Sequence, residues 1–139
     1  MLILSLQCDT FEYAVKSPTA QAIDLDPGQL DVPNRFENCL FLLVSIDETD
    51  GIKQVTRAAK AIVKVVHATG VKQLIINGFA ALSGHPADQH RAQEMLRLLG
   101  ERLAEREPAL PVEHMPFGWR KRWIMDVVAG LWAQRSIRT

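Results

Sequence analysis

The feature that most constrains the fold is the segment at residues 38–46, NCLFLLVSI, the most hydrophobic strand candidate of the chain. We expect it to form a central strand of a sheet. Between Ile52 and Ala68 apolar residues recur at helical spacing, and Gly70 stands in the usual C-terminal capping position. Residues 71–77, VKQLIIN, then predict another buried strand. The order strand, helix, strand is typical of an α/β fold, in which helices pack on a sheet.

The N-terminal part of the chain predicts two more strands and a long connection. Residues 1–6 form a short apolar run, as in a strand buried on both faces, whereas residues 11–16 alternate between apolar and polar side chains. We expect these strands to form a hairpin with its turn at or near residues 8–10. Residues 17–37 are rich in Pro and Gly and predict a surface excursion or a mobile loop.

The second half of the chain adds a helix and two strands. We expect a loop at 78–85, a helix at 87–106, strands at 112–115 and 120–128, and a short helix or tail at 129–139. At 139 residues the chain has the size of one domain. The predicted fold is therefore a single α/β domain, residues 1–139, with two main helices on a mixed, largely antiparallel sheet.

The charge of the chain argues against binding to nucleic acid by bulk charge. Sixteen Lys and Arg residues balance sixteen Asp and Glu residues, whereas nucleic-acid-binding domains are usually basic. Residues 119–139 nevertheless hold five cationic residues against one acidic residue, Asp126. Such a patch beside tryptophans suits the end of a nucleic acid or a phosphate-bearing ligand. The alternative is a solvated positive edge strand that discourages aggregation.

Two further sequence features concern the cellular location. The apolar run at residues 1–4 is too short for a membrane span or a signal peptide. Cys8 and Cys39 both lie in apolar, strand-like segments, where reduced core thiols are typical. We therefore expect a cytoplasmic protein without a membrane contact.

Several common catalytic motifs are absent from the sequence. Neither GxGxxG nor GxxxxGK[ST] follows a strand. His85 and His90 are five residues apart, on different faces of a helix, and neither CxxC nor HExxH accompanies them, so we expect no metal site and no cofactor. Ser83 lacks the GxSxG context of a hydrolase nucleophile, which favours a loop or helix-capping serine.

Two segments remain that are unusual for a structural role alone. Residues 79–83 leave a strand with small side chains, which let a ligand approach the backbone. Residues 116–123 hold two tryptophans, a phenylalanine and three consecutive cations. In a strand, Lys121 and Trp123 share one face and Arg120 points to the other. Lys121 is thus a candidate catalytic or anchoring group, the alternative being a lysine that extends to solvent at a sheet edge.

These segments resemble the N-terminal editing domain of archaeal threonyl-tRNA synthetase. The resemblance runs over essentially the whole chain, and its most specific element is the Pro-Phe-Gly-aromatic-x-Lys block. It rests on Asp9, Phe11-Glu12-Tyr13, the loop Ala80-Ala81-Leu82-Ser83, and Pro116-Phe117-Gly118-Trp119 with Lys121. It implies a D-aminoacyl-tRNA deacylase-like fold, a homodimer, and metal-free hydrolysis of serine mischarged onto threonine tRNA.

The resemblance also implies roles for individual residues. Lys121 matches the family's lysine, which assists the attacking water. The ribose hydroxyl of the tRNA also assists this water. The amino-acid pocket and its surroundings would comprise Val44, Ser45, Ala80, Ala81, Leu82, Ser83, Pro116, Phe117, Gly118, Trp119, Arg120 and Gln134. The implied partners are the acceptor end of threonine tRNA and a separate threonyl-tRNA synthetase, since the sequence stops at Thr139 and predicts either a free-standing editing factor or an excised domain.

Four positions depart from the pattern of the family. Its histidine in Ala-His-Leu-Ser is Ala81, its tyrosine before the lysine is Arg120, a C-terminal glutamate is Gln134, and a histidine near the end of the first strand is Gln7. Two hypotheses follow. The chain is an aminoacyl-tRNA deacylase that uses Lys121, or it is a non-enzymatic binding module for an aminoacyl-tRNA end, a small amino-acid-like ligand or a protein partner.

Overall fold

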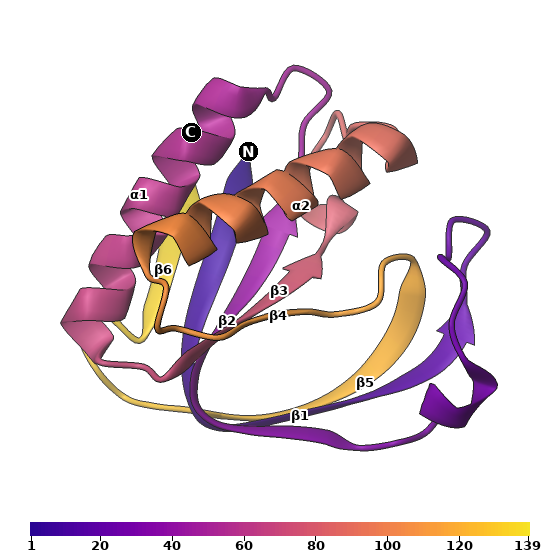
Figure 1. Ribbon diagram of the computed structural model, residues 1–139, viewed down its shortest axis with the longest axis horizontal. Coiled ribbons are helices and arrows are strands. Elements are labelled where there is room, and N and C mark those ends of the chain that lie inside the picture. Colours follow the sequence, from indigo (N-terminus) through magenta and orange to yellow (C-terminus); the bar gives the residue numbers. More distant parts are fainter.

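The computed structural model describes residues 1–139 as one six-stranded sheet with both long helices on the same face (Figure 1). The strands are β1 (Leu2–Pro18), β2 (Asn34–Ser45), β3 (Gln73–Gly78), β4 (Val112–His114), β5 (Trp119–Val127) and β6 (Gln134–Arg138). The helices are α1 (Ile52–Thr69) and α2 (Gln89–Arg106), with 3-10 turns η1 (Pro27–Gln29) and η2 (Ala80–Leu82). Neither α1 nor α2 is long and apolar enough to cross a membrane.

The sheet is mixed, with the strand order β4-β3-β2-β1-β5 and with β6 paired to β1. β1 runs antiparallel to β2, β5 and β6, whereas the pairs β2–β3 and β3–β4 are parallel. The expected mixed, largely antiparallel sheet with two main helices is confirmed. The carboxyl ends of β2 and β3 consequently lie side by side at one edge of the fold.

Local sequence explains where the helices begin and end. Gly70 ends α1 in the left-handed conformation, with φ at +69°, as its position after the helical pattern predicts. α2 begins at Gln89, two residues later than expected, because the Asp88 side chain accepts hydrogen bonds from the amides of His90 and Arg91. Asp88 is therefore the N-cap of α2.

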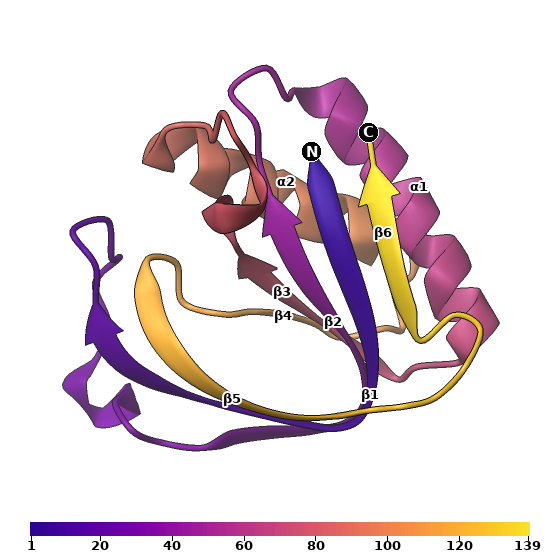
Figure 2. The same cartoon turned by 180° about the vertical axis from the view of Figure 1, so that it is seen from behind.

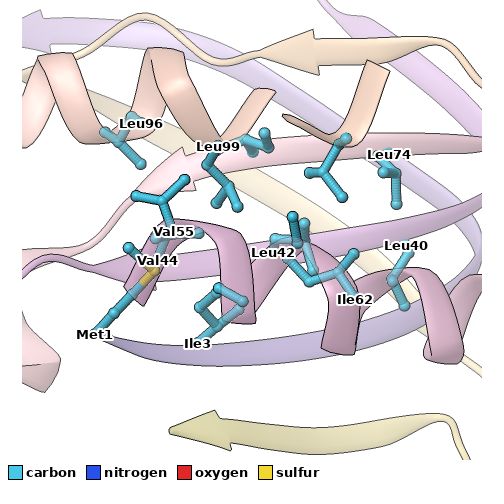
Figure 3. Close-up of a cluster of buried hydrophobic side chains, with 14 of the residues drawn as sticks. Met1, Ile3, Leu40, Leu42, Val44, Val55, Ile62, Leu74, Leu96 and Leu99 are labelled. Carbon is cyan, nitrogen blue, oxygen red and sulfur yellow. The ribbon is translucent and has the colours of Figure 1, made fainter. Parts of the chain in front are cut away.

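Each face of the sheet has its own hydrophobic cluster. Leu40, Leu42 and Val44 of β2 face the helices, in a cluster of 19 buried residues whose members point toward one another in Figure 3. Phe41 and Leu43 point to the opposite face, in a second cluster of nine buried residues. This alternation is the two-residue period of a strand that is covered on both faces. The second cluster lies on the face of the sheet away from the helices, and Trp119, Trp123 and Val127 of β5 pack against it.

The hairpin expected at residues 1–16 is wrong, because β1 is one continuous strand. Its pairing with β5 shifts register between Cys8 and Thr10, where we expected the turn. On the neighbouring strand Asn38 adopts φ of +47°. Cys8 and Phe11 consequently face the same cluster although three positions separate them. A bulge of this kind bends a strand, and β1 turns at this point to run beside β5 (Figure 2).

The short helix or tail expected at residues 129–139 is also wrong in part. Gln134–Arg138 form β6, which pairs with Leu2–Leu6 of β1. β5 and β6 thus share one edge of β1, one on each side of the bend. Cys8 and Cys39 lie opposite each other on β1 and β2, both buried and reduced, as expected for core thiols.

Candidate functional site

A cavity of about 800 Å³ lies at the carboxyl ends of β2 and β3, bordered by the start of α2 and the start of β5. Ligands commonly bind at the carboxyl ends of parallel strands in α/β sheets. Twenty residues line the cavity, and eleven of them are hydrophobic. They are Thr19, Gln21, Val44, Ile46, Asn77, Gly78, Phe79, Ala80, Ala81, Pro86, Ala87, Gln89, Ala92, Leu96, Phe117, Gly118, Trp119, Arg120, Lys121 and Trp123.

Lys121 extends from the inner face of β5 into this cavity. Its Nζ donates to Asn77 Oδ1 at 3.1 Å and to the carbonyl oxygen of Trp119 at 3.0 Å. No Asp or Glu is among the lining residues, and Arg120 is the only other charged one. Burial lowers the pKa of Lys121 from 10.5 to about 8, because the charged form of the amine loses hydration inside the protein.

The Pro-Phe-Gly-Trp segment forms a tight turn that is fastened to the loop after β1. Gly118 has φ of +77°, and a Cβ at this position would lie 2.5 Å from the carbonyl oxygen of Gln21. Thr19 donates to Gly118 O through its amide at 2.9 Å and through its hydroxyl at 2.6 Å. Trp119 Nε1 donates to Ile23 O at 2.8 Å. The beginning of the predicted 17–37 loop is therefore an ordered rim of the cavity.

The small-residue segment after β3 forms the opposite wall. The amide of Phe79 donates to Val44 O at 2.8 Å, which holds the segment against β2, and η2 follows. The amides of Ala80 and Ala81 are the first donors of this turn and make no hydrogen bond within the protein. Small side chains at these positions leave the backbone open to the cavity.

The structure brings together eight of the residues that the sequence singled out. Val44, Ala80, Ala81, Phe117, Gly118, Trp119, Arg120 and Lys121 all line the cavity. On β5, Lys121 and Trp123 are half-buried while Arg120 and Arg122 are exposed, which is the alternation expected from the strand pattern. Trp123 also packs edge-on against Phe41 of the second cluster.

The other five singled-out residues lie outside the cavity lining. Ser45 is fully buried, and its hydroxyl has no hydrogen-bond partner. The hydroxyl of Ser83 is hydrogen-bonded to Asp47 and accepts from the amide of His85, so it stabilises the loop that follows η2. Leu82 lies beside Ser83 and lines a different cavity with it. Pro116 borders a neighbouring cavity of about 330 Å³. Gln134 lies on β6 opposite Leu6 and is exposed.

The sequence did not single out Asn77, although it is the side chain that contacts the Lys121 amine. Asn77 is 3% exposed and stands at the end of the apolar run VKQLIIN. Asparagine is common where a strand meets a turn, so its position alone carried no functional information. A polar residue directly after a run of buried apolar residues, at the end of a strand, is the sequence pattern that would have indicated Asn77.

Among solved structures, the fold is similar to that of the c-Myc DNA Unwinding Element Binding Protein. The TM-score is 0.71 at 10% sequence identity, and the match covers 100% of this chain and 99% of the other. Agreement at so low an identity shows the fold alone. The α/β architecture predicted from the sequence, with its D-aminoacyl-tRNA deacylase-like arrangement of sheet and helices, is the architecture found.

Sequence comparison gives a family as well as a fold. The threonine–tRNA ligase of Thermofilum pendens is 30% identical over 128 residues, and that of Staphylothermus marinus is 32% identical over 129 residues. Each match covers 91% of this chain but only 20% of the ligase, so the chain spans about one fifth of the length of these relatives. The family model for the archaea-specific editing domain of threonyl-tRNA synthetase matches residues 1–134. With this match across nearly its whole length, the chain belongs to the family of archaea-specific editing domains of threonyl-tRNA synthetase.

Proposed function

We propose that the chain hydrolyses the ester bond of mischarged aminoacyl-tRNA, with serine on threonine tRNA as the substrate. The observation that carries this proposal is the position of the Lys121 amine. It lies in the cavity that the backbone of Ala80 and Ala81 also lines, and it is held by two hydrogen bonds. A lysine with a purely solubilising role would place its amine in water.

The reaction requires few functional groups from the protein, because an aminoacyl ester is already activated. Water attacks the carbonyl carbon, a tetrahedral oxyanion forms, and the bond to the ribose oxygen breaks while that oxygen takes a proton. The products are the free amino acid and a tRNA with a free ribose hydroxyl. Lys121 would assist the attacking water together with the ribose hydroxyl beside the ester. The unpaired amides of Ala80 and Ala81 are suitable donors for the oxyanion.

Selection of serine over threonine would depend on the shape of the cavity. Threonine differs from serine by one methyl group, and a rigid wall can exclude a methyl group without any polar contact. Val44, Ala80 and Ala81 present short side chains and backbone, fixed by the hydrogen bond between Phe79 and Val44. Such a wall has few rotamers with which to make room.

A binding module without catalysis is the second candidate, and a specific observation favours it. Three side chains that the family resemblance would assign to the site are replaced, by Ala81, Arg120 and Gln134. Ala81 offers no polar group, Arg120 lies on the exposed face of β5, and Gln134 lies outside the cavity lining. The remaining cavity could still hold an aminoacylated tRNA end or a small amino-acid-like ligand.

The decisive experiment compares deacylation of Ser-tRNA(Thr) and Thr-tRNA(Thr) by wild type, Lys121→Met and Lys64→Met. Lys64 is an exposed residue of α1, so its variant controls for the loss of one cation. We expect wild type and Lys64→Met to release serine selectively, and Lys121→Met to fall to the uncatalysed rate. Equal, background-level decay of both esters in all samples would overturn the proposal and leave the binding module.

The same proposal includes the assembly and the partners. We propose that the domain over residues 1–139 forms a homodimer and acts on the acceptor end of threonine tRNA, in association with threonyl-tRNA synthetase. With a net charge of zero the domain would bind tRNA weakly by itself, because affinity follows the number of phosphates that are neutralised. Sedimentation equilibrium measures the dimer, and a gel-shift titration at low and physiological salt measures the tRNA contact.

A further inference from the structure

We propose that Asn77 is a positioning residue for Lys121, and that its neutral carboxamide aims the lone pair of the lysine amine into the cavity. The role in catalysis rests on the proposed deacylase function, whereas the arrangement of the two side chains does not. The side chain of Asn77 is uncharged. It holds the amine in place without the carboxylate that usually partners a buried lysine.

The contact exists only because the sheet curls. In the strand order β4-β3-β2-β1-β5, two strands separate β3, which carries Asn77, from β5, which carries Lys121. Asn77 shares with Ile75 the face of β3 that looks toward the second hydrophobic cluster, whereas Ile76 faces the helices. The bend of β1 brings β5 over this face (Figure 2), so that the 3.1 Å hydrogen bond can span it.

The Lys121 amine donates to two acceptors of the protein. A neutral lysine amine has two N–H groups and one lone pair, and an ammonium has three N–H groups. Asn77 Oδ1 and Trp119 O accept from Nζ, and no third protein acceptor is within reach. The third tetrahedral position of the nitrogen therefore belongs to the cavity. In the neutral amine this position is the lone pair, where a water about to attack an ester would donate its proton.

The orientation of the carboxamide follows from the same hydrogen bonds. An amine that is protonated can only donate, so the oxygen of the Asn77 side chain must face Nζ. Asn77 is almost fully buried, and its Nδ2 group makes no hydrogen bond within the protein. It borders the cavity and is free to donate to a carbonyl oxygen there.

The electrostatic surroundings suit an amine that works in its neutral form. The lining residues from β2, β3, η2, the start of α2 and the loop after β1 are all uncharged, and β5 contributes Arg120 as the one charged neighbour of Lys121 in the lining. With two neutral acceptors and no carboxylate, burial dominates, which is why the pKa falls to about 8. A carboxylate at residue 77 would favour the ammonium, in which a proton occupies the lone pair of the amine, and would reduce the neutral fraction of Lys121 at a given pH.

The test uses Asn77→Asp, which keeps the shape of the side chain and adds a charge beside the amine. The first readout is the rate at which acetic anhydride acetylates Lys121 as a function of pH, followed by peptide mass spectrometry, which needs no tRNA. We expect a midpoint near pH 8 in wild type and at least one pH unit higher in Asn77→Asp. Gln89→Glu adds the same charge on the α2 side of the cavity, away from the Lys121 hydrogen bonds, and should shift the midpoint less.

The second readout is deacylation of Ser-tRNA(Thr). At pH 7.5 Asn77→Asp should lose about tenfold in kcat, because each unit of pKa reduces the neutral fraction about tenfold, and should recover at higher pH with KM unchanged. Asn77→Leu, which removes the acceptor but keeps a branched side chain of similar shape, should lose at least about tenfold in kcat at every pH.

Three outcomes are distinguishable. An acetylation midpoint that does not move in Asn77→Asp, or a wild-type kcat in Asn77→Leu, would overturn the role of Asn77. A midpoint that shifts in Asn77→Asp, together with a wild-type protein that shows no deacylation, would support the arrangement of the two side chains and reject the proposed reaction. A shifted midpoint together with a shifted pH profile of kcat would support both.

Discussion

At the scale of the residue, Lys121 has a cost for folding as well as a proposed role. The pKa of Lys121 is about 8 in the folded protein and about 10.5 in an unfolded chain, so below pH 8 folding places the ammonium in an unfavourable environment. Because part of the side chain still contacts solvent, water reduces this penalty, and we expect Lys121→Met to stabilise the fold by about 1–2 kcal/mol at pH 7. Loss of activity with a gain in stability is typical of residues kept for function.

The dependence of this gain on pH gives the measurement its control. The unfolded chain binds the extra proton between pH 8 and 10.5, so wild-type stability rises through this window and the advantage of Lys121→Met shrinks. Urea unfolding at pH 7 and pH 10 measures the difference in unfolding free energy between Lys121→Met and wild type at each pH, with Lys64→Met as the matched variant. A Lys121→Met protein that is less stable than wild type at pH 7 would show that the amine contributes net binding energy to the fold.

At the scale of the element, Gly118 connects the Pro-Phe-Gly turn to the rim of the cavity. An alanine Cβ would lie 2.5 Å from Gln21 O and 2.6 Å from two backbone atoms of Ala22, in a conformation with φ of +77°. We expect Gly118→Ala to displace the rim, break the hydrogen bonds from Thr19, and reduce the free energy of unfolding by at least about 2 kcal/mol.

Gly70 provides the matched control for the clash. Its φ is +69°, close to that of Gly118, but nothing lies within 4 Å of a Cβ placed there. Gly70→Ala should therefore cost only the backbone strain, about 1 kcal/mol. Thermal unfolding of both variants separates strain from clash, and equal losses at the two positions would contradict the close approach of the rim to the turn.

Elements with strong patterns were predictable from the sequence, and those set by tertiary contacts were not. The apolar runs around Leu42 and Ile75 and the helical spacing before Gly70 identified β2, β3 and α1, because burial on one or both faces is written in the residues themselves. β6 has only Ile137 half-buried among polar residues. It becomes a strand because β1 offers it an open edge, and no local pattern carries that information.

The error at residues 8–10 has the same origin. A polar Asp9 and Thr10 between two apolar segments are typical of a turn, and also of a bulge in one long strand. Only the partner strands decide between the two, and here both β2 and β5 continue past Asp9. In the candidate site, Lys121 was predictable from strand alternation, whereas Asn77 was not, since its partner comes from a strand that is distant in the sheet.

At the scale of the whole molecule, the bend of β1 links the fold to the site. It lets one strand pair with β2 along its length while β5 and β6 share its other edge. The curled half of the sheet carries Lys121 and the other half carries the carboxyl ends of β2 and β3, and residues of both halves line the cavity. A flat sheet of the same strands would separate Asn77 from Lys121 by three interstrand spacings, about 14 Å.

The two chain ends meet at a buried ion pair near the start of α1, and this contact carries the last prediction. The ammonium of Met1 is fully buried and lies 2.6 Å from Asp50 Oδ1, while the amide of Thr139 donates to Met1 O at 3.1 Å. Asp50 Oδ2 also accepts from the amide of Asp47 at 2.8 Å, and Arg91 donates to the carbonyl oxygen of Asp50. Through its carboxylate and its backbone carbonyl, Asp50 is thus the centre of a network that joins β1, α1, α2 and the C-terminus.

Removing only its charge leaves the buried Met1 ammonium with the more distant and partly exposed carboxylate of Asp47, at 3.6 Å, as its counter-ion. We expect Asp50→Asn to reduce the free energy of unfolding by about 2 kcal/mol at neutral pH, less than the cost of about 3 kcal/mol for a buried charge left without any partner. Asp24→Asn, at an exposed position, should stay within about 0.5 kcal/mol of wild type. Urea unfolding at pH 7 measures both variants. Because no residue of the network lines the cavity or contacts the Lys121 amine, Asp50→Asn should retain the acetylation midpoint of Lys121 near pH 8 as long as it is folded. A shift of that midpoint would mean that the stability of the chain ends controls the curl of the sheet and, through it, the site.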